Sequence, residues 1–149
     1  MPIHRRAFLS LGLLALAACA KKSKPAKDHP GRTPEMDRLV NKYSQIYDMP
    51  PSLLHRLIQR ESGYNAAARN GSYYGLLQIA PQTAKTMGYK GTPSGLLDAE
   101  TNLKYAGKYL RGAWLLSHGS QDKAIYWYAH GYYYEAKRRK MLKETGLVS

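Results

Sequence analysis

Glu61 is the residue whose type and position most clearly suggest chemistry. Leu54, Leu57 and Ile58 precede it by seven, four and three residues, so a helical period places its carboxylate on an apolar face. Burial there, and the negative end of a helix closed by Gly63, would both raise the pKa of the carboxyl group. A carboxylic acid that stays protonated near neutral pH suits general acid catalysis. The alternative is a solvated carboxylate in a frayed last turn.

Four short motifs follow one another around and beyond this glutamate. They are Glu61-Ser62-Gly63-Tyr64-Asn65, Gly75-Leu76-Leu77-Gln78-Ile79 with Pro81 and Thr83-Ala84, Asn102-Leu103 with Gly107, Tyr109 and Leu110, and Ala124-Ile125 with Tyr128 and Gly131. In order and spacing they resemble the soluble lytic transglycosylase (SLT) family, which has a goose-type lysozyme fold. The resemblance covers roughly residues 38–136. It implies cleavage of peptidoglycan between N-acetylmuramic acid and N-acetylglucosamine, leaving a 1,6-anhydromuramyl end, without metal or cofactor.

The resemblance also assigns roles to single residues. Glu61 matches the one catalytic acid and base. Ser62 matches the residue that helps to hold the sugar N-acetyl group, and Tyr128 matches a tyrosine whose hydroxyl orients the catalytic carboxylate. The positions matched to substrate binding are Ser62, Gly75, Leu77, Gln78 and Tyr128. Leu77 stands where the family usually has methionine, a swap that keeps the side-chain volume.

The fourth motif departs from the family pattern. Ala129 replaces an asparagine and His130 replaces a small residue. Alanine forms no side-chain hydrogen bond, so His130 is either a substitute for the asparagine amide or a packing residue.

Tyrosine is abundant, with 13 residues beside one phenylalanine. We expect some of these rings to keep a polar edge in use, because tyrosine combines an apolar body with a hydroxyl. The candidates for stacking on sugar faces are Tyr73, Tyr74 and Tyr132, with Tyr133 and Tyr134 beside them. Because consecutive helical residues point in different directions, at most two of residues 132–134 would line one groove.

The number of carboxylates bears on the mechanism. Glycosidases usually use two, but the motif region offers only Glu61, since Asp98 and Glu100 are explained by capping of a helix. We therefore expect a scheme with one carboxylate. Glu61 would protonate the leaving oxygen, the substrate's N-acetyl group would stabilise C1, and Glu61 would then take the proton of the C6 hydroxyl.

The first 32 residues are typical of export and anchoring. Arg5 and Arg6 precede an apolar run over residues 7–18, which is shorter than the roughly 20 residues that span a bilayer. The run ends in a lipobox-like sequence before Cys19, so we expect a lipoprotein signal peptide over 1–18, of Sec or twin-arginine type, and lipidation of Cys19. Residues 19–32 are predicted to form a flexible tether.

The rest of the chain has the composition and periodicity of one all-α domain over residues 33–149, with a lysozyme-like fold. The predicted helices cover about 34–47, 51–63, 81–87, 98–118, 120–131 and 132–142. The formal net charge of +13 favours acidic partners. Export separates the protein from DNA, so we expect no nucleic-acid partner. We expect a monomer that binds peptidoglycan and is held by its lipid at a periplasmic membrane, the outer membrane rather than the inner.

Three other functions compete with this prediction. A muramidase of the same fold would use water, and product analysis separates the two. A non-catalytic wall-binding module is disfavoured by the intact Glu61 and Gln78. Nucleic-acid binding by residues 137–140 is disfavoured by export, and four basic residues on a terminal helix are more often a solvated or membrane-facing patch.

Overall fold

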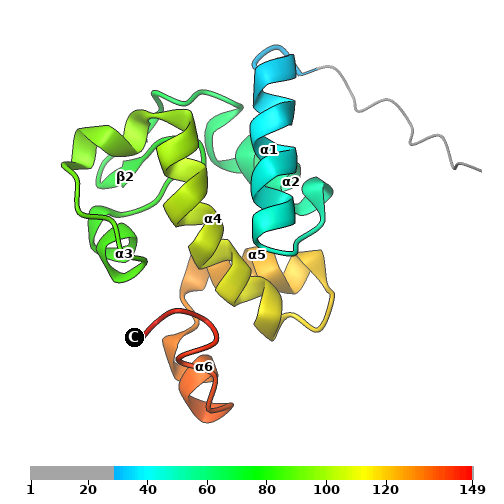
Figure 1. Ribbon diagram of the computed structural model, residues 1–149, viewed down its shortest axis with the longest axis vertical. Helices are drawn as coiled ribbons and strands as arrows, with labels where there is room; N and C mark the ends of the chain where they lie inside the picture. The colour runs from blue at the N-terminus through cyan, green and yellow to red at the C-terminus, as the bar shows by residue number, and fades with distance from the viewer. Residues whose placement is uncertain (1–28, 149) are drawn as a thin grey trace, which may run out of the picture.

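A computed structural model describes residues 29–148 as a helical domain (Figure 1). The elements are α1 (Pro34–Ile46), α2 (Pro51–Ser62), β1 (Arg69–Asn70), β2 (Tyr73–Tyr74), α3 (Pro81–Thr86), the 3-10 helix η1 (Pro93–Leu97), α4 (Ala99–Leu116), α5 (Gln121–His130) and α6 (Tyr133–Arg138). This confirms the predicted all-α, lysozyme-like class. Within the described residues, no helix is both long and apolar enough to cross a membrane.

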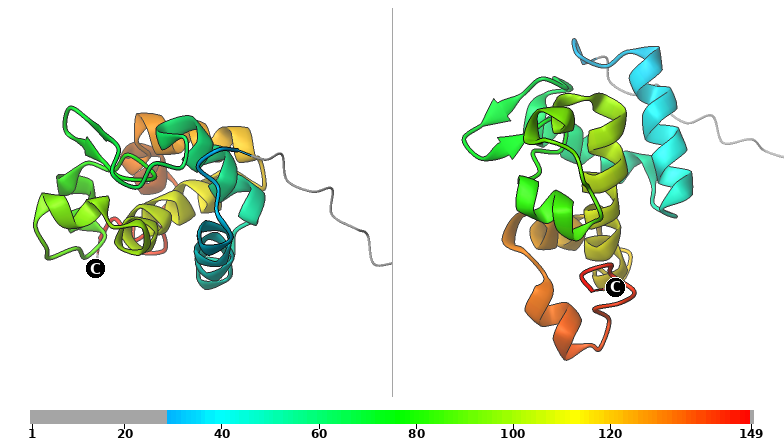
Figure 2. Two further views of the ribbon diagram at one scale, coloured as in Figure 1. Left: turned by 90° about the horizontal axis from the view of Figure 1, so that it is seen from above. Right: turned by 60° about the vertical axis from the view of Figure 1, so that its left-hand side comes forward.

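Helix α4 is the central support of the domain. It packs against α1, α3, α5 and η1, and its fully buried positions Leu103, Ala106, Leu110 and Ala113 recur at helical spacing. The side chain of Asp98 caps its start by accepting a hydrogen bond from the amide of Thr101 at 2.8 Å. The first motif and the loop after it lie on one side of α4, and α5 crosses it farther along (Figure 2).

Helices α1 and α2 begin and end as the sequence predicts. The hydroxyl of Thr33 accepts a hydrogen bond from the Met36 amide at 3.1 Å, which caps α1. Helix α2 starts after the proline pair and ends at Gly63, whose φ of +58° is the left-handed conformation that suits glycine. The last turn of α2 therefore carries Glu61 and Ser62.

The short hairpin β1–β2 has no counterpart in the sequence prediction. Arg69 pairs with Tyr74 and Asn70 with Tyr73 in antiparallel register. Each strand has two residues, which is too short for an alternating pattern of apolar and polar residues to be recognised.

The C-terminal helix is shorter than predicted. Helix α6 ends at Arg138, and Lys140 has a φ of +59°, which turns the chain back instead of extending the helix to residue 142. The following segment docks on α4, where Arg111 Nη1 donates to the Glu144 carbonyl at 2.9 Å and Thr145 is buried. Helix α6 and the C-terminus lie at the end of the molecule opposite the start of α1 (Figure 1).

Two residues of the predicted tether make contacts with the helical domain. Arg32 Nε is 2.6 Å from Asp37 Oδ1, and the rings of His29 and Tyr64 lie 5.2 Å apart. Residues 29–32, assigned to the flexible tether, therefore contact the domain. The predicted signal peptide over 1–18 and the lipidation site at Cys19 lie outside the described residues.

Candidate active site

Glu61 lies in the last turn of α2 and is largely covered. Its side chain is 23 % exposed, and this burial raises the pKa of its carboxyl group. Arg60 Nε lies 3.5 Å from Glu61 Oε1 and opposes the shift by favouring the charged form. Burial has the larger effect, so the acid form persists to higher pH than in an exposed glutamate.

The second motif forms a tight loop held at its ends. Tyr74 and Ile79 exchange two backbone hydrogen bonds of 3.1 Å, which close the loop over residues 75–78. Gly75 has a φ of +77°, and a Cβ atom there would lie 2.2 Å from the carbonyl oxygen of Leu96. The loop therefore requires glycine at this position for both conformation and space.

Asn102 binds this loop to α4. Its Nδ2 donates to the carbonyls of Tyr74 and Leu96 at 2.8 Å each, and its Oδ1 accepts from the amide of Leu77 at 2.9 Å. The side chain is fully buried, and these three bonds satisfy most of its hydrogen-bonding capacity. Sequence reasoning placed Asn102 in a motif but gave it no role. Its position could have indicated that role, because a side-chain amide on the buried face of a helix needs hydrogen-bond partners.

Leu77 is held from its other side by Tyr128. The Tyr128 hydroxyl donates to the carbonyl oxygen of Leu77 at 2.7 Å, and the Leu77 side chain is fully buried. The single hydroxyl hydrogen is thus directed to Leu77, and the hydroxyl oxygen keeps acceptor capacity, so the role expected for Tyr128 in orienting Glu61 stays a prediction. The two groups still interact, because burial first and then the charge of Glu61 raise the pKa of Tyr128.

Gln78 closes the loop with its own side chain. Its Nε2 donates to the carbonyls of Ala68 at 3.1 Å and Gly75 at 2.9 Å, while its backbone adopts a left-handed φ of +48°. Backbone strain of this kind persists where neighbouring bonds hold it, and it is common at functional sites.

A pocket of 220 Å³ opens beside this loop. It lies between the second and fourth motifs, so Gln78 and Tyr128 both contribute to its wall. The lining residues are Tyr73, Gln78, Ile79, Ala80, Thr83, Tyr109, Tyr128, Ala129, His130 and Gly131. The fold therefore brings together predicted binding residues that lie 50 positions apart in the chain, Gln78 and Tyr128.

A model of the transglycosylase SLT domain matches residues 38–146, which include Glu61, the loop, Asn102 and Tyr128. The chain belongs to the transglycosylase SLT domain family. The match extends beyond residue 136, where the sequence resemblance ended, so α6 and the docked segment are part of the SLT domain. Membership makes the protein an enzyme that acts on peptidoglycan.

Ser62 follows the catalytic candidate of this SLT domain. Its hydroxyl donates to the Ile58 carbonyl one turn back at 3.2 Å and is half-buried. That bond occupies the hydroxyl hydrogen and leaves the oxygen as an acceptor, suited to the amide N–H of an N-acetyl group.

The three tyrosines expected to stack on sugars differ in exposure. Tyr132 is 1 % exposed, its hydroxyl donates to the Tyr109 carbonyl at 2.8 Å, and its ring stacks on the Tyr109 ring. The prediction that Tyr132 stacks on substrate is therefore wrong, because packing on α4 covers the ring. Tyr74 is also buried, with the guanidinium of Arg69 4.7 Å from its ring centroid. Tyr73 is exposed at the pocket.

Within residues 29–148, no group of three or more His, Cys, Asp or Glu side chains is arranged to hold a metal ion.

Proposed function

We propose that this SLT-domain enzyme is a lytic transglycosylase that cleaves the β-1,4 bond between N-acetylmuramic acid and N-acetylglucosamine without water. Glu61 acts first as acid and then as base. The observation that carries the proposal is that Glu61 is largely covered and that burial raises the pKa of its carboxyl group. Its charge also lies close enough to Tyr128 to raise the pKa of that hydroxyl.

The carboxylates of Asp122 on α5 and Glu135 on α6 are paired with arginines. Asp122 Oδ1 lies 2.6 Å from Arg56 Nη2. Hydrogen bonds from Arg138 and Arg139 lower the pKa of Glu135 to about 2, so this residue is a poor proton donor near neutral pH. These pairings favour a scheme in which Glu61 alone transfers protons.

The first step breaks the glycosidic bond. The acid form of Glu61 gives its proton to the bridging oxygen, which leaves with the bonding electrons as the hydroxyl of N-acetylglucosamine. The carbonyl oxygen of the muramyl N-acetyl group attacks C1 as that bond breaks. The acceptor oxygen of Ser62 is suited to holding the N–H of this group in place.

The second step closes the anhydro ring. The Glu61 carboxylate takes the proton of the C6 hydroxyl, and O6 displaces the N-acetyl oxygen from C1. Glu61 returns to its acid form and no water is consumed. The loop over residues 75–78 is held firmly because Asn102 and Tyr128 bind Leu77 from both sides, and Gln78 of this loop lines the 220 Å³ pocket.

Mass spectrometry of the muropeptides released from purified sacculi tests this proposal. We expect products lighter by one water than the hydrolytic ones, and no release by the Glu61→Gln variant. Reducing ends as the main product would replace the proposal with a muramidase, and undiminished release by Glu61→Gln would overturn both.

We also propose that the enzyme works at a periplasmic membrane face, attached through a lipid on Cys19. The proposal rests on the lipobox-like sequence that ends at Cys19. Cys19→Ala should abolish incorporation of a fatty-acid probe and release the protein from membranes. Retention of both label and membrane association would contradict the anchor.

A further inference from the structure

The segment before α1 packs against the turn that follows Glu61. A Cβ atom on Gly31 would lie 2.7 Å from the Gly63 carbonyl oxygen and 2.8 Å from the Cβ atom of Tyr64. The backbone of Gly31 is therefore in direct contact with this turn. The rings of His29 and Tyr64, whose centroids lie 5.2 Å apart, form a second contact between the segment and the turn.

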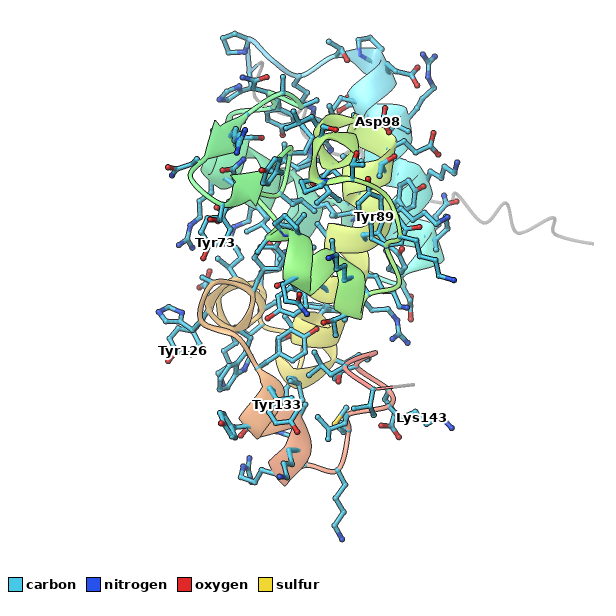
Figure 3. All side chains as sticks on the ribbon, turned by 90° about the vertical axis from the view of Figure 1, so that its left-hand side faces the viewer. Tyr73, Tyr89, Asp98, Tyr126, Tyr133 and Lys143 are labelled. Atoms are coloured by element: carbon cyan, nitrogen blue, oxygen red, sulfur yellow. The ribbon has the colours of Figure 1, made fainter. Side chains whose placement is uncertain are left out.

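This segment is separate from the pocket beside the second motif. Figure 3 shows it at the end of the molecule farthest from Tyr133 on α6, and none of residues 29–32 lines the 220 Å³ pocket. The segment also precedes residues 38–146, which match the SLT model. Family membership alone therefore does not predict the contact, and binding of substrate in the pocket does not explain it.

The turn contains two consecutive residues with left-handed backbone conformations. Gly63 has a φ of +58° and Tyr64 a φ of +67°, and the second is uncommon for an aromatic residue. Such a conformation persists where the surrounding structure fixes it. Tyr64 is buried, and its hydroxyl lies 2.9 Å from His55 Nδ1 on α2. The turn is thus held by α2 and by the segment before α1.

The same turn ends the helix that carries the catalytic carboxyl group. The Gly63 amide donates to the Gln59 carbonyl at 3.3 Å, which closes the last turn of α2 around Glu61. The Asn65 amide donates to the Ser62 carbonyl at 3.1 Å. Because the ends of helices fray when these bonds are lost, the position of the Glu61 carboxyl group depends on the turn.

Arg32 joins the segment to α1 and to the residues that hold the turn. Its Nε donates to Asp37 Oδ1 at 2.6 Å, and its amide donates to the His29 carbonyl at 2.8 Å. Asp37 Oδ1 also lies 3.7 Å from His55 Nε2. Burial lowers the pKa of His55 and the charge of Arg32 lowers it further, whereas Asp37 raises it. Burial raises the pKa of Tyr64, which the charge of Arg32 opposes. One network therefore connects the segment, α1, α2 and the turn.

We propose that residues 29–32 form a clamp that positions Glu61 for proton transfer, with Gly31 and Arg32 as positioning residues. This inference rests on the proposed function and deepens it. The clamp holds the turn after α2, and the turn holds the helical residues that bear the carboxyl group. The clamp is also the end of the predicted tether that starts at Cys19. Attachment of the enzyme and placement of its acid would then depend on one segment.

Two variants of the full chain loosen the clamp without changing the pocket. Gly31→Ala adds one methyl group at a position whose φ is not left-handed, so its effect arises from collision with the turn. Arg32→Gln removes the charge that faces Asp37, and Arg32→Lys is the conservative variant that keeps it. Arg38→Gln is the matched control, because Arg38 forms an exposed ion pair within α1.

Rates of muropeptide release are measured against sacculus concentration, at a temperature at which circular dichroism shows every variant to be folded. We expect kcat to fall about tenfold in Gly31→Ala and Arg32→Gln with KM nearly unchanged, because displacing a catalytic group slows the chemical step. Arg32→Lys should recover most of the rate. Arg38→Gln should match the wild-type enzyme.

Nuclear magnetic resonance measures the clamp independently of activity. Exchange of the Gly63 and Asn65 amide hydrogens should be faster in Gly31→Ala and Arg32→Gln than in the wild-type protein. The pKa of His55 should rise in Arg32→Gln, because a charge that lowers it is removed and Asp37 remains. It should not change in Arg38→Gln.

Three results would overturn the proposal. The first is a wild-type kcat in both Gly31→Ala and Arg32→Gln, with or without faster amide exchange. The second is a rise in KM alone, because the segment would then contribute to substrate binding. The third is a lowered kcat with unchanged exchange of the Gly63 and Asn65 amides, because the effect would not pass through the turn.

The products separate this inference from the proposed function. Reducing ends from the wild-type enzyme, together with a lowered kcat in Gly31→Ala and Arg32→Gln, would replace the transglycosylase with a muramidase and leave the clamp in place. Anhydro products together with a wild-type kcat in both variants would keep the proposed reaction and remove the clamp.

Discussion

The hydroxyl of Tyr128 on α5 donates a hydrogen bond to the carbonyl oxygen of Leu77 at 2.7 Å. On the other side of the same residue, the Leu77 amide donates to Asn102 on α4. One peptide segment is therefore held by two helices that belong to different parts of the chain. The loop that forms the pocket wall depends on how α4 and α5 pack.

Removing this hydroxyl tests its role. Tyr128→Phe keeps the ring but leaves the Leu77 carbonyl without its partner, so we expect a loss of about 1–2 kcal/mol in the free energy of unfolding. Muropeptide release should also fall, because the loop and the surroundings of Glu61 lose a constraint. Urea unfolding and release assays on the same preparation measure both effects. Wild-type values in both would show that the hydrogen bond is dispensable.

Asn102 should be more sensitive than its small side chain suggests. Asn102→Ala leaves two carbonyls and one amide without their partners in the core, and we expect a loss of roughly 3 kcal/mol or more in the free energy of unfolding. Asn41→Ala on the exposed face of α1 is the matched control, expected within about 0.5 kcal/mol of wild type. Similar losses for both variants would contradict the binding of the loop by Asn102.

Glu61 should make the protein less stable at neutral pH than a neutral isostere would. Burial raises the folded-state pKa above the unfolded value, so the unfolded state loses its proton first as pH rises. Glu61→Gln should match wild type below the ordinary carboxyl pKa. Its relative stability should increase as pH rises through the unfolded and then the folded pKa, and stay constant above. Unfolding curves across pH test this, and a pH-independent difference would argue against burial of the charge.

Arg60 should set the alkaline limit of activity. Its charge lowers the pKa of Glu61, so Arg60→Gln should raise that pKa further and keep the acid form to higher pH. The alkaline limb of the kcat/KM profile should then move to higher pH, whereas Arg60→Lys, which keeps the charge, should leave it near the wild-type position. A shift to lower pH in Arg60→Gln would contradict Glu61 as the acid.

The predictions from the sequence were correct where a structural feature depends on residues that are close together in the chain. Capping residues and apolar periodicity located α1, α2, α4 and α5 to within about two residues, because a helix is specified by its own side chains. The same periodicity placed Glu61 on a covered face. The four motifs identified the family because their order and spacing can be recognised in the sequence without knowledge of the fold.

Contacts and hydrogen bonds between segments far apart in the chain could be identified only from the tertiary structure. Tyr132 is a core residue because the segment between α5 and α6 packs its ring onto Tyr109. The Tyr128 hydroxyl bonds to Leu77 because α5 crosses beside the loop. The partners of Asn102 lie 6, 25 and 28 positions away in the chain. Periodicity reports which face of an element is buried, but the hydrogen-bond partner of a buried group is set by how elements pack against one another.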